Sequence, residues 1–149
     1  MAHQTAAGVT LGITATAPAS HDETGFSALT FTAVGELTAV GEFGKEFALV
    51  THNPLSTRGT KKGKGSFNNG TLNPTLALDP SDGGQALMEA ALESDENYFF
   101  VVTLQDGTPF YMKGLVMSFK PNVGGVDDVV TATTAIELAP DPIIKGVTP

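Results

Sequence analysis

The chain has 149 residues, 41% of them hydrophobic, and a formal net charge of −8, a composition typical of one folded domain with a buried core. Cysteine is absent and the three histidines lie far apart, at positions 3, 21 and 52, which excludes disulfides and argues against a metal site. No stretch approaches the roughly 18 apolar residues that a membrane-spanning helix needs, so no membrane partner is expected.

The N-terminal third predicts strands. Residues 1–10 lack the charged start and the apolar run of a signal peptide, so we expect the protein to remain in a cytoplasm or in something assembled there. Residues 8–17 alternate small or apolar residues with threonine and glycine at a period of two, which predicts a strand. Residues 17–25 have the composition of a loop. Further strands are expected over 26–37, with a break near Gly35, and over 42–51.

A basic segment follows, and we expect a flexible loop over about 53–70. Residues 56–70 hold four of the eight basic residues and no acidic one. The net charge is −8 and this segment contributes +4, so the rest of the chain carries −12. An acidic body repels phosphate backbones, which argues against a dedicated DNA-binding domain. The four basic residues are Arg58, Lys61, Lys62 and Lys64.

The same segment superficially resembles a phosphate-binding loop, but its spacing is wrong. A Walker A motif needs GxxxxGK followed by serine or threonine, and here Gly65 follows Lys64. The residues after it, SFNNGTLNP, cannot form the helix whose N-terminus would hold the phosphate. We therefore expect no nucleotide site and no cofactor.

The remaining chain predicts four more strands and one helix. The helix is indicated by Asp82 followed three residues later by Gln85, which resembles a capping box, and by apolar residues at helical spacing after it. An Asp106-Gly107 turn predicts a hairpin. We expect strands over 71–78 (interrupted at Pro74), 97–104, 110–120 and 129–138, a helix over 83–94, and a short tail over about 140–149.

About seven strands and one helix indicate a mainly β fold: a two-sheet antiparallel sandwich or partly closed barrel with one flanking helix. A single domain over 1–149 is expected. No nucleophile elbow or histidine constellation is present, so we expect no catalytic residue and no enzymatic activity. Asp127-Asp128 is interpreted as a solvated turn, and Glu93, Asp95 and Glu96 as an exposed acidic corner.

The order of elements resembles the tail tube, or major tail, protein of long-tailed, non-contractile (siphovirus-type) phages. The features that carry the resemblance are VTLGITAT at the start, the Gly/Lys loop, the Gly-Gln-Ala-Leu helix, the aromatic strand with its D-G hairpin, GLVMSFKP, and the final Thr/Val strand. The resemblance covers nearly the whole chain, without one diagnostic motif.

The resemblance implies a structural virion protein that forms homohexameric rings. The rings would stack into a tube through which DNA passes on ejection, and other tail proteins would be partners. It also implies a virion tail location, with assembly in the cytoplasm of the bacterial host. An acidic lumen would suit such a conduit, because lysine–phosphate contacts would hold the DNA. We expect Arg58, Lys61, Lys62 and Lys64 to form a subunit-contact loop, with residues 57–69 becoming ordered on ring stacking.

Three alternatives stay open. One is a tube protein like that of type VI secretion, and another is a different virion component, such as a capsid decoration protein. The third is a monomeric β-sandwich binding module whose basic loop, if it is not simply solvated, contacts an anionic ligand.

Overall fold

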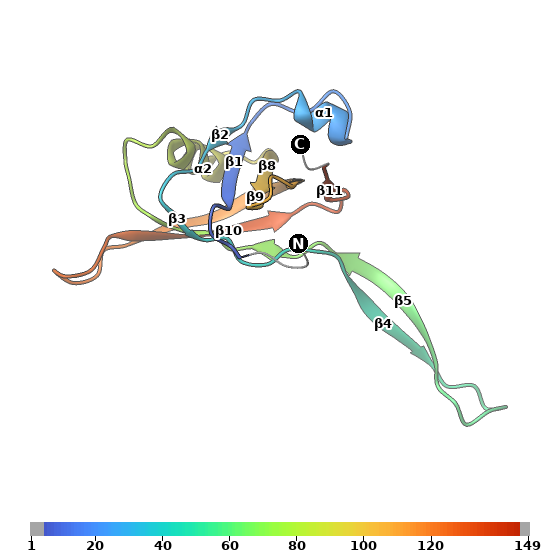
Figure 1. Cartoon of the computed structure of the whole chain (residues 1–149). Helices are drawn as coiled ribbons and strands as arrows, with labels where there is room; N and C mark the ends of the chain where they lie inside the picture. The colour runs from blue at the N-terminus through green and yellow to red at the C-terminus, as the bar shows by residue number, and fades with distance from the viewer. Residues whose placement is uncertain (1–4, 147–149) are drawn as a thin grey trace.

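The computed structural model in Figure 1 describes residues 5–146 of a mainly β chain. Residues 1–4 and 147–149 lie outside the described residues, so the ends of the expected domain and tail are not covered. The described residues form eleven strands and two helices. The strands are β1 (Thr10–Thr14), β2 (Thr32–Ala33), β3 (Leu37–Ala39), β4 (Glu46–His52), β5 (Lys61–Asn68), β6 (Thr71–Leu72), β7 (Thr75–Ala77), β8 (Tyr98–Thr103), β9 (Pro109–Asn122), β10 (Thr131–Leu138) and β11 (Ile144–Lys145); the helices are α1 (Glu23–Ser27) and α2 (Gly83–Glu93).

Nine strands form one antiparallel sheet, and β4 with β5 forms a second. The main order is β2-β1-β8-β9-β10-β7-β3, with β11 added to β9 and β6 added to β10. β2 and β3 lie at opposite ends of this order and do not pair with each other, so the sheet is not closed into a barrel. The expected mainly β, two-sheet antiparallel fold with a flanking helix is confirmed.

The long strand β9 belongs to both halves of the sheet. Its first part pairs with β8 and its second part with β10, and the two ladders meet at Gly114, which lies opposite both Tyr98 and Leu138. A Cβ on Gly114 would lie 2.7 Å from the carbonyl oxygen of Glu137, so only glycine fits where the strand changes partners. A bulge nearby leaves Met117 without a partner on β10.

One main core fills the space between the two halves of the sheet and α2. It takes alternate residues from the longer strands of the nine-stranded sheet, as expected for strands with one buried face. Its fully buried members include Leu11, Ile13, Leu72, Leu76, Met88, Phe100, Met112 and Ile136. A second cluster lies on the other face of β8 and β9, where the Phe26 ring of α1 stacks on Tyr111 at 5.1 Å between ring centroids.

A buried glutamine fixes the segment that joins β2 to β3. Gln85 lies in the first turn of α2 and is 2% exposed. Its Nε2 donates to the carbonyl oxygens of Gly35 (3.1 Å) and Ala77 (2.9 Å), and its Oε1 accepts from the N–H of Asp79 (2.9 Å). Asp82 caps α2 as predicted, accepting from the N–H of Gln85 at 3.0 Å. A capping box would also have the Gln85 side chain accept from the N–H of Asp82. Here that side chain instead hydrogen-bonds to Gly35, Ala77 and Asp79.

Three elements differ from the sequence predictions. The expected 17–25 loop and 26–37 strand overlap helix α1, which Asp22 caps through the N–H of Gly25 at 2.8 Å. The expected tail contains β11, which pairs with β9. Residues 61–68 of the expected loop form strand β5, because backbone pairing with β4 extends through the glycines.

Candidate functional site

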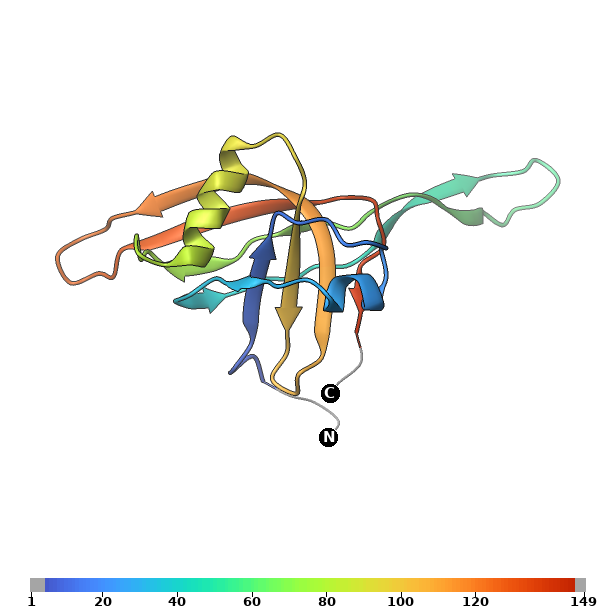
Figure 2. The same ribbon diagram turned by 90° about the horizontal axis from the view of Figure 1, so that it is seen from above.

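A two-stranded hairpin projects away from the rest of the molecule. We call residues 46–68 the arm: β4, β5 and the connection 53–60 between them. Figures 1 and 2 show it extending from one end of the body. The side chains of β4 are all exposed, and on β5 only Gly65 is half-buried. The arm therefore contributes nothing to the main core, and its side chains are free for contact with another molecule.

The arm is unusually apolar for an exposed hairpin. Phe47 lies directly opposite Phe67, with 5.7 Å between ring centroids, and Leu49 lies opposite Lys64. Leu49 is 67% exposed, and Val50 and the tip residue Leu55 are exposed as well. Exposed apolar side chains that gather in this way mark interaction sites in soluble proteins.

Lysines cover the aromatic pair of the arm. The Nζ of Lys64 lies 4.8 Å from the centroid of the Phe47 ring, and that of Lys45 lies 4.5 Å from the centroid of the Phe67 ring. Cations at such distances interact favourably with the ring face, by about 0.5–1 kcal/mol at an exposed site. This face of the arm is thus both apolar and positively charged.

The four basic residues expected at the site all lie in the arm. Lys61, Lys62 and Lys64 belong to β5, and Arg58 belongs to the 53–60 connection. The pairing with β4 sets their positions, since Lys62 lies opposite Thr51 and Lys61 opposite His52. The exposed apolar residues beside them were missed by the sequence analysis, although the alternation of Phe47, Leu49 and Thr51 is visible in the sequence.

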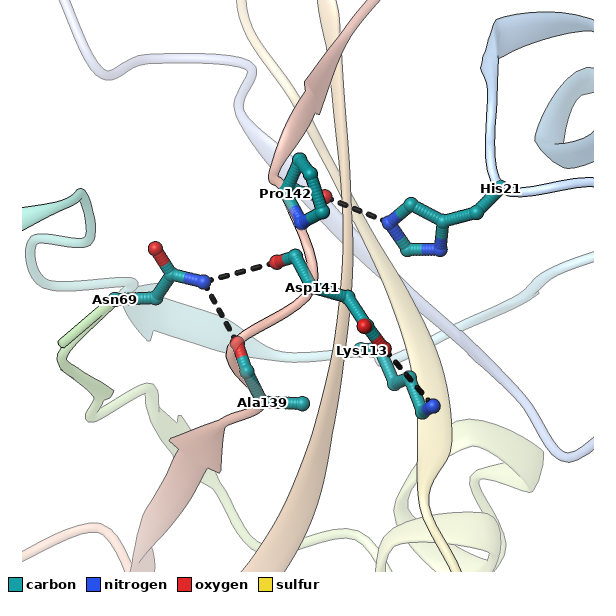
Figure 3. Close-up of polar contacts among 6 residues, drawn as sticks. All are labelled: His21, Asn69, Lys113, Ala139, Asp141 and Pro142. Atoms are coloured by element: carbon teal, nitrogen blue, oxygen red, sulfur yellow. Dashed lines mark hydrogen bonds and ion pairs between the residues drawn. The ribbon is translucent and has the colours of Figure 1, made fainter. Parts of the chain in front are cut away.

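The arm joins the body at Asn69, which is 2% exposed. Its Nδ2 donates to the carbonyl oxygens of Ala139 (2.6 Å) and Asp141 (2.9 Å), as Figure 3 shows. The carbonyl oxygen of Asn69 also accepts from the N–H of Gly44 at 3.2 Å, which closes the base of the hairpin. Asn69 therefore ties the arm to the segment between β10 and β11.

That segment, residues 139–143, is held from two further sides (Figure 3). The ammonium group of Lys113 lies 2.9 Å from Oδ2 of Asp141, and this hydrogen bond holds the pKa of the Asp141 carboxyl below its usual value. The Nε2 of His21 lies 2.7 Å from the carbonyl oxygen of Pro142. These contacts connect the segment at the arm base to His21, just before α1, and to Lys113 on β9.

A second hairpin end projects from the opposite end of the body (Figure 2). We call residues 121–130 the finger; they join β9 to β10. Val123, Val126 and Val129 are exposed, and Val126 is 100% exposed. The finger contains Asp127 and Asp128 and no basic residue. The carboxylate of Asp128 accepts from the N–H of Gly125 at 2.9 Å and so stabilises the turn, while Asp127 is exposed as predicted.

The cleft beside the start of β1 offers no comparable chemistry. A cleft of about 350 Å³ between the β1 start, β3 and β8 is lined by residues without a charged side chain. Within residues 5–146, no three histidine or acidic side chains lie where they could share a metal ion. Over the same range, no helix has both the length and the apolar character needed to cross a membrane.

Comparison with known proteins gives a match of structure and not of sequence. The chain matches no protein-family model and no curated protein sequence. A chain of the PVC sheath/tube terminator, from an extracellular contractile injection system, superposes with a TM-score of 0.71 at 7% identity, over 99% of both chains. A chain from the tail of an empty GTA particle, solved with C6 symmetry, gives 0.67 at 13% identity, over 99% of this chain and 100% of that one. The SPP1 tail tube gives 0.64 at 14% identity, over 93% of this chain and 76% of that one.

The chain thus has the fold of tail tube and tube terminator proteins. The likeness extends over nearly all of the chain, so it includes the arm as well as the body. At 7–14% identity, it is a likeness of fold alone.

Proposed function

We propose that this chain is a structural subunit that assembles with copies of itself into stacked hexameric rings, which form the tube of a long non-contractile phage tail. DNA would pass through the tube, and other tail proteins would bind its ends. The arm would make the contacts between subunits. The fold is shared with a contractile system's terminator as well as with a tail tube, so the non-contractile assignment rests on the sequence resemblance.

The observation that carries this proposal is the arm itself. It exposes Phe47, Leu49 and Phe67 and packs none of them in the core. A two-stranded hairpin without further packing is only marginally stable in water. Burial of its apolar face against another copy would offset that cost, so the arm, including most of residues 57–69, would become fully ordered as rings stack.

The charge distribution supports the conduit role. The chain outside residues 56–70 carries −12, since the total is −8 and that segment contributes +4. A surface of this sign does not bind phosphate groups and so would let DNA slide. The basic residues Arg58, Lys61, Lys62 and Lys64 would then pair with acidic groups of a neighbouring subunit, which favours association.

The decisive experiment is excision of the arm. Residues 47–67 are replaced by Asn-Gly, which joins Glu46 to Asn68 through a two-residue hairpin turn. The excision spares Asn69 and Gly44, whereas a deletion of 57–69 would also remove the buried amide at the arm base. We expect a folded monomer with an unchanged melting temperature that no longer forms rings or tubes.

Particle mass by size-exclusion chromatography and negative-stain electron microscopy measure the outcome. A matched control replaces only Ser56 and Thr57 at the arm tip, by glycine and serine, which leaves both strands, Leu55 and Arg58 in place and should leave assembly unchanged. Tubes formed by the excised chain would contradict the proposal. A wild-type chain that stays monomeric at high concentration would favour the binding-module alternative instead.

A further inference from the structure

The exposed large apolar side chains of the described residues lie in two places only. Five are in the arm: Phe47, Leu49, Val50, Leu55 and Phe67. Three more are in the finger: Val123, Val126 and Val129. The ninth, Met117, lies on the same β9–β10 hairpin, at the bulge in β9. The rest of the described surface has none of this kind. Patches of such residues normally mark sites that are covered in an assembly.

The two places carry opposite charge. The arm holds four basic residues and a single acidic one, Glu46, whereas the finger holds two acidic residues and no basic one. Opposite charges around apolar contacts suit partners that must meet in one orientation, because like charges would oppose the wrong pairing. The arm and the finger therefore complement each other in charge, and each exposes apolar side chains to the other.

The arm and the finger cannot meet within one chain, because they project from opposite ends of the body (Figures 1 and 2). A contact between them joins two copies head to tail. Such a contact uses two different surfaces, and it leaves a free arm at one end and a free finger at the other. Repetition then produces a ring or an open stack, according to the rotation between neighbouring copies, rather than a closed twofold dimer.

We propose that the arm of one copy docks on the finger of the next copy. This inference rests on the proposed self-assembly and names the surface that receives the arm. Val123, Val126 and Val129 provide the apolar contact, and Asp127 faces the lysines of β5. Asp128 is not part of this contact, because its carboxylate accepts a hydrogen bond from Gly125 and so stabilises the turn.

The acidic end of α2 is the competing acceptor. Glu89, Glu93, Asp95 and Glu96 are exposed there and provide more charge than the finger does. No large apolar side chain is exposed among them, however, so Phe47, Leu49 and Phe67 would stay in water. The finger is favoured because it can both cover the apolar side chains of the arm and pair with its basic residues.

Charge exchange tests the pairing. Asp127→Lys alone, or Lys61→Glu with Lys62→Glu, should each raise the critical concentration for assembly about tenfold or more, because each places like charges at the contact. A chain that carries all three substitutions should assemble within about threefold of wild type. Glu93→Lys on α2 is the matched control and should change nothing. Light scattering against concentration gives the critical concentration, and circular dichroism shows that each variant is folded.

The outcomes separate this inference from the proposed function. If wild type assembles, the excised-arm chain does not, and Asp127→Lys has no effect, the finger is the wrong acceptor while the proposed function stands. Loss of assembly in Glu93→Lys would identify α2 as the acceptor instead. Failure of the combined chain to recover would also overturn the pairing. A wild-type chain that never assembles would overturn both proposals.

Discussion

Replacement of Gln85 by leucine tests the idea that one side chain holds the open end of the sheet together. The amide joins three segments: Gly35 between β2 and β3, Ala77 at the end of β7, and Asp79 before α2. Leucine has a similar volume, so Gln85→Leu removes the hydrogen bonds without leaving a large cavity.

The expected loss in the free energy of unfolding follows from three hydrogen bonds to half-buried backbone groups. Each hydrogen bond contributes about 0.5–1.5 kcal/mol net. Its loss costs more where the backbone group that loses its partner remains buried away from water. We expect the free energy of unfolding to fall by about 3 kcal/mol. For a chain of this size, 1 kcal/mol corresponds to about 2–4 °C, so the melting temperature should fall by about 6–12 °C.

Urea unfolding followed by circular dichroism measures the loss. The control is Glu89→Leu, an exposed change one turn further along α2, which should stay within about 0.5 kcal/mol of wild type. Gln85→Glu supplies a second check. At neutral pH its carboxylate cannot donate to the carbonyl oxygens of Gly35 and Ala77, whereas the protonated acid can donate to one of them. Its deficit should therefore shrink as the pH falls. A Gln85→Leu chain as stable as the Glu89→Leu chain would refute the reasoning.

Three further predictions concern the arm and its base. Asn69→Ala removes both donations to the 139–141 carbonyls, so the unfolding free energy should fall by about 1–3 kcal/mol and amide hydrogen exchange over 139–145 should accelerate; unchanged exchange there would contradict the tether. Asp141→Asn should cost at most about 0.5–1 kcal/mol at pH 7, because the carboxylate is 42% exposed. Since folding lowers the pKa of Asp141, that difference should be lost as the pH falls through and below the folded value. A difference that persists below the folded pKa, itself measured by NMR titration, would refute the ion pair as its source. Leu49→Ser should leave the melting temperature unchanged but weaken association about 5- to 30-fold, from about 1–2 kcal/mol of lost apolar burial; an equal loss in thermal stability would show that Leu49 packs within the subunit.

The sequence predicted the elements that carry their own periodicity or caps. β10 alternates buried residues with half-buried or exposed ones along its length, β8 is a run of buried and half-buried residues, and Asp82 caps α2 as expected. Pro74 breaks its strand into β6 and β7, and its carbonyl oxygen accepts from the hydroxyl of Thr134 at 2.8 Å.

The missed elements have no such local signal. β11 is two residues long and exists because β9 extends past β10, leaving an edge at Tyr111. β5 contains Gly63 and Gly65, which favour a loop, and only pairing with β4 makes it a strand. The basic residues of the candidate site could be identified from charge alone. The turn of the finger could be predicted from Asp127 and Asp128, but the exposure of its valines could not, because valine also occurs in buried strands.

The separation of the arm from the core has a consequence for how such proteins diversify. No arm side chain is packed in the core, so in the proposed assembly substitutions there would alter association while leaving the body intact. Two related chains made in one cell would then keep their assemblies apart through changes confined to arm and finger, provided that each arm remained matched to its own finger. Partner choice in such an assembly would be set by a segment that folding itself does not constrain.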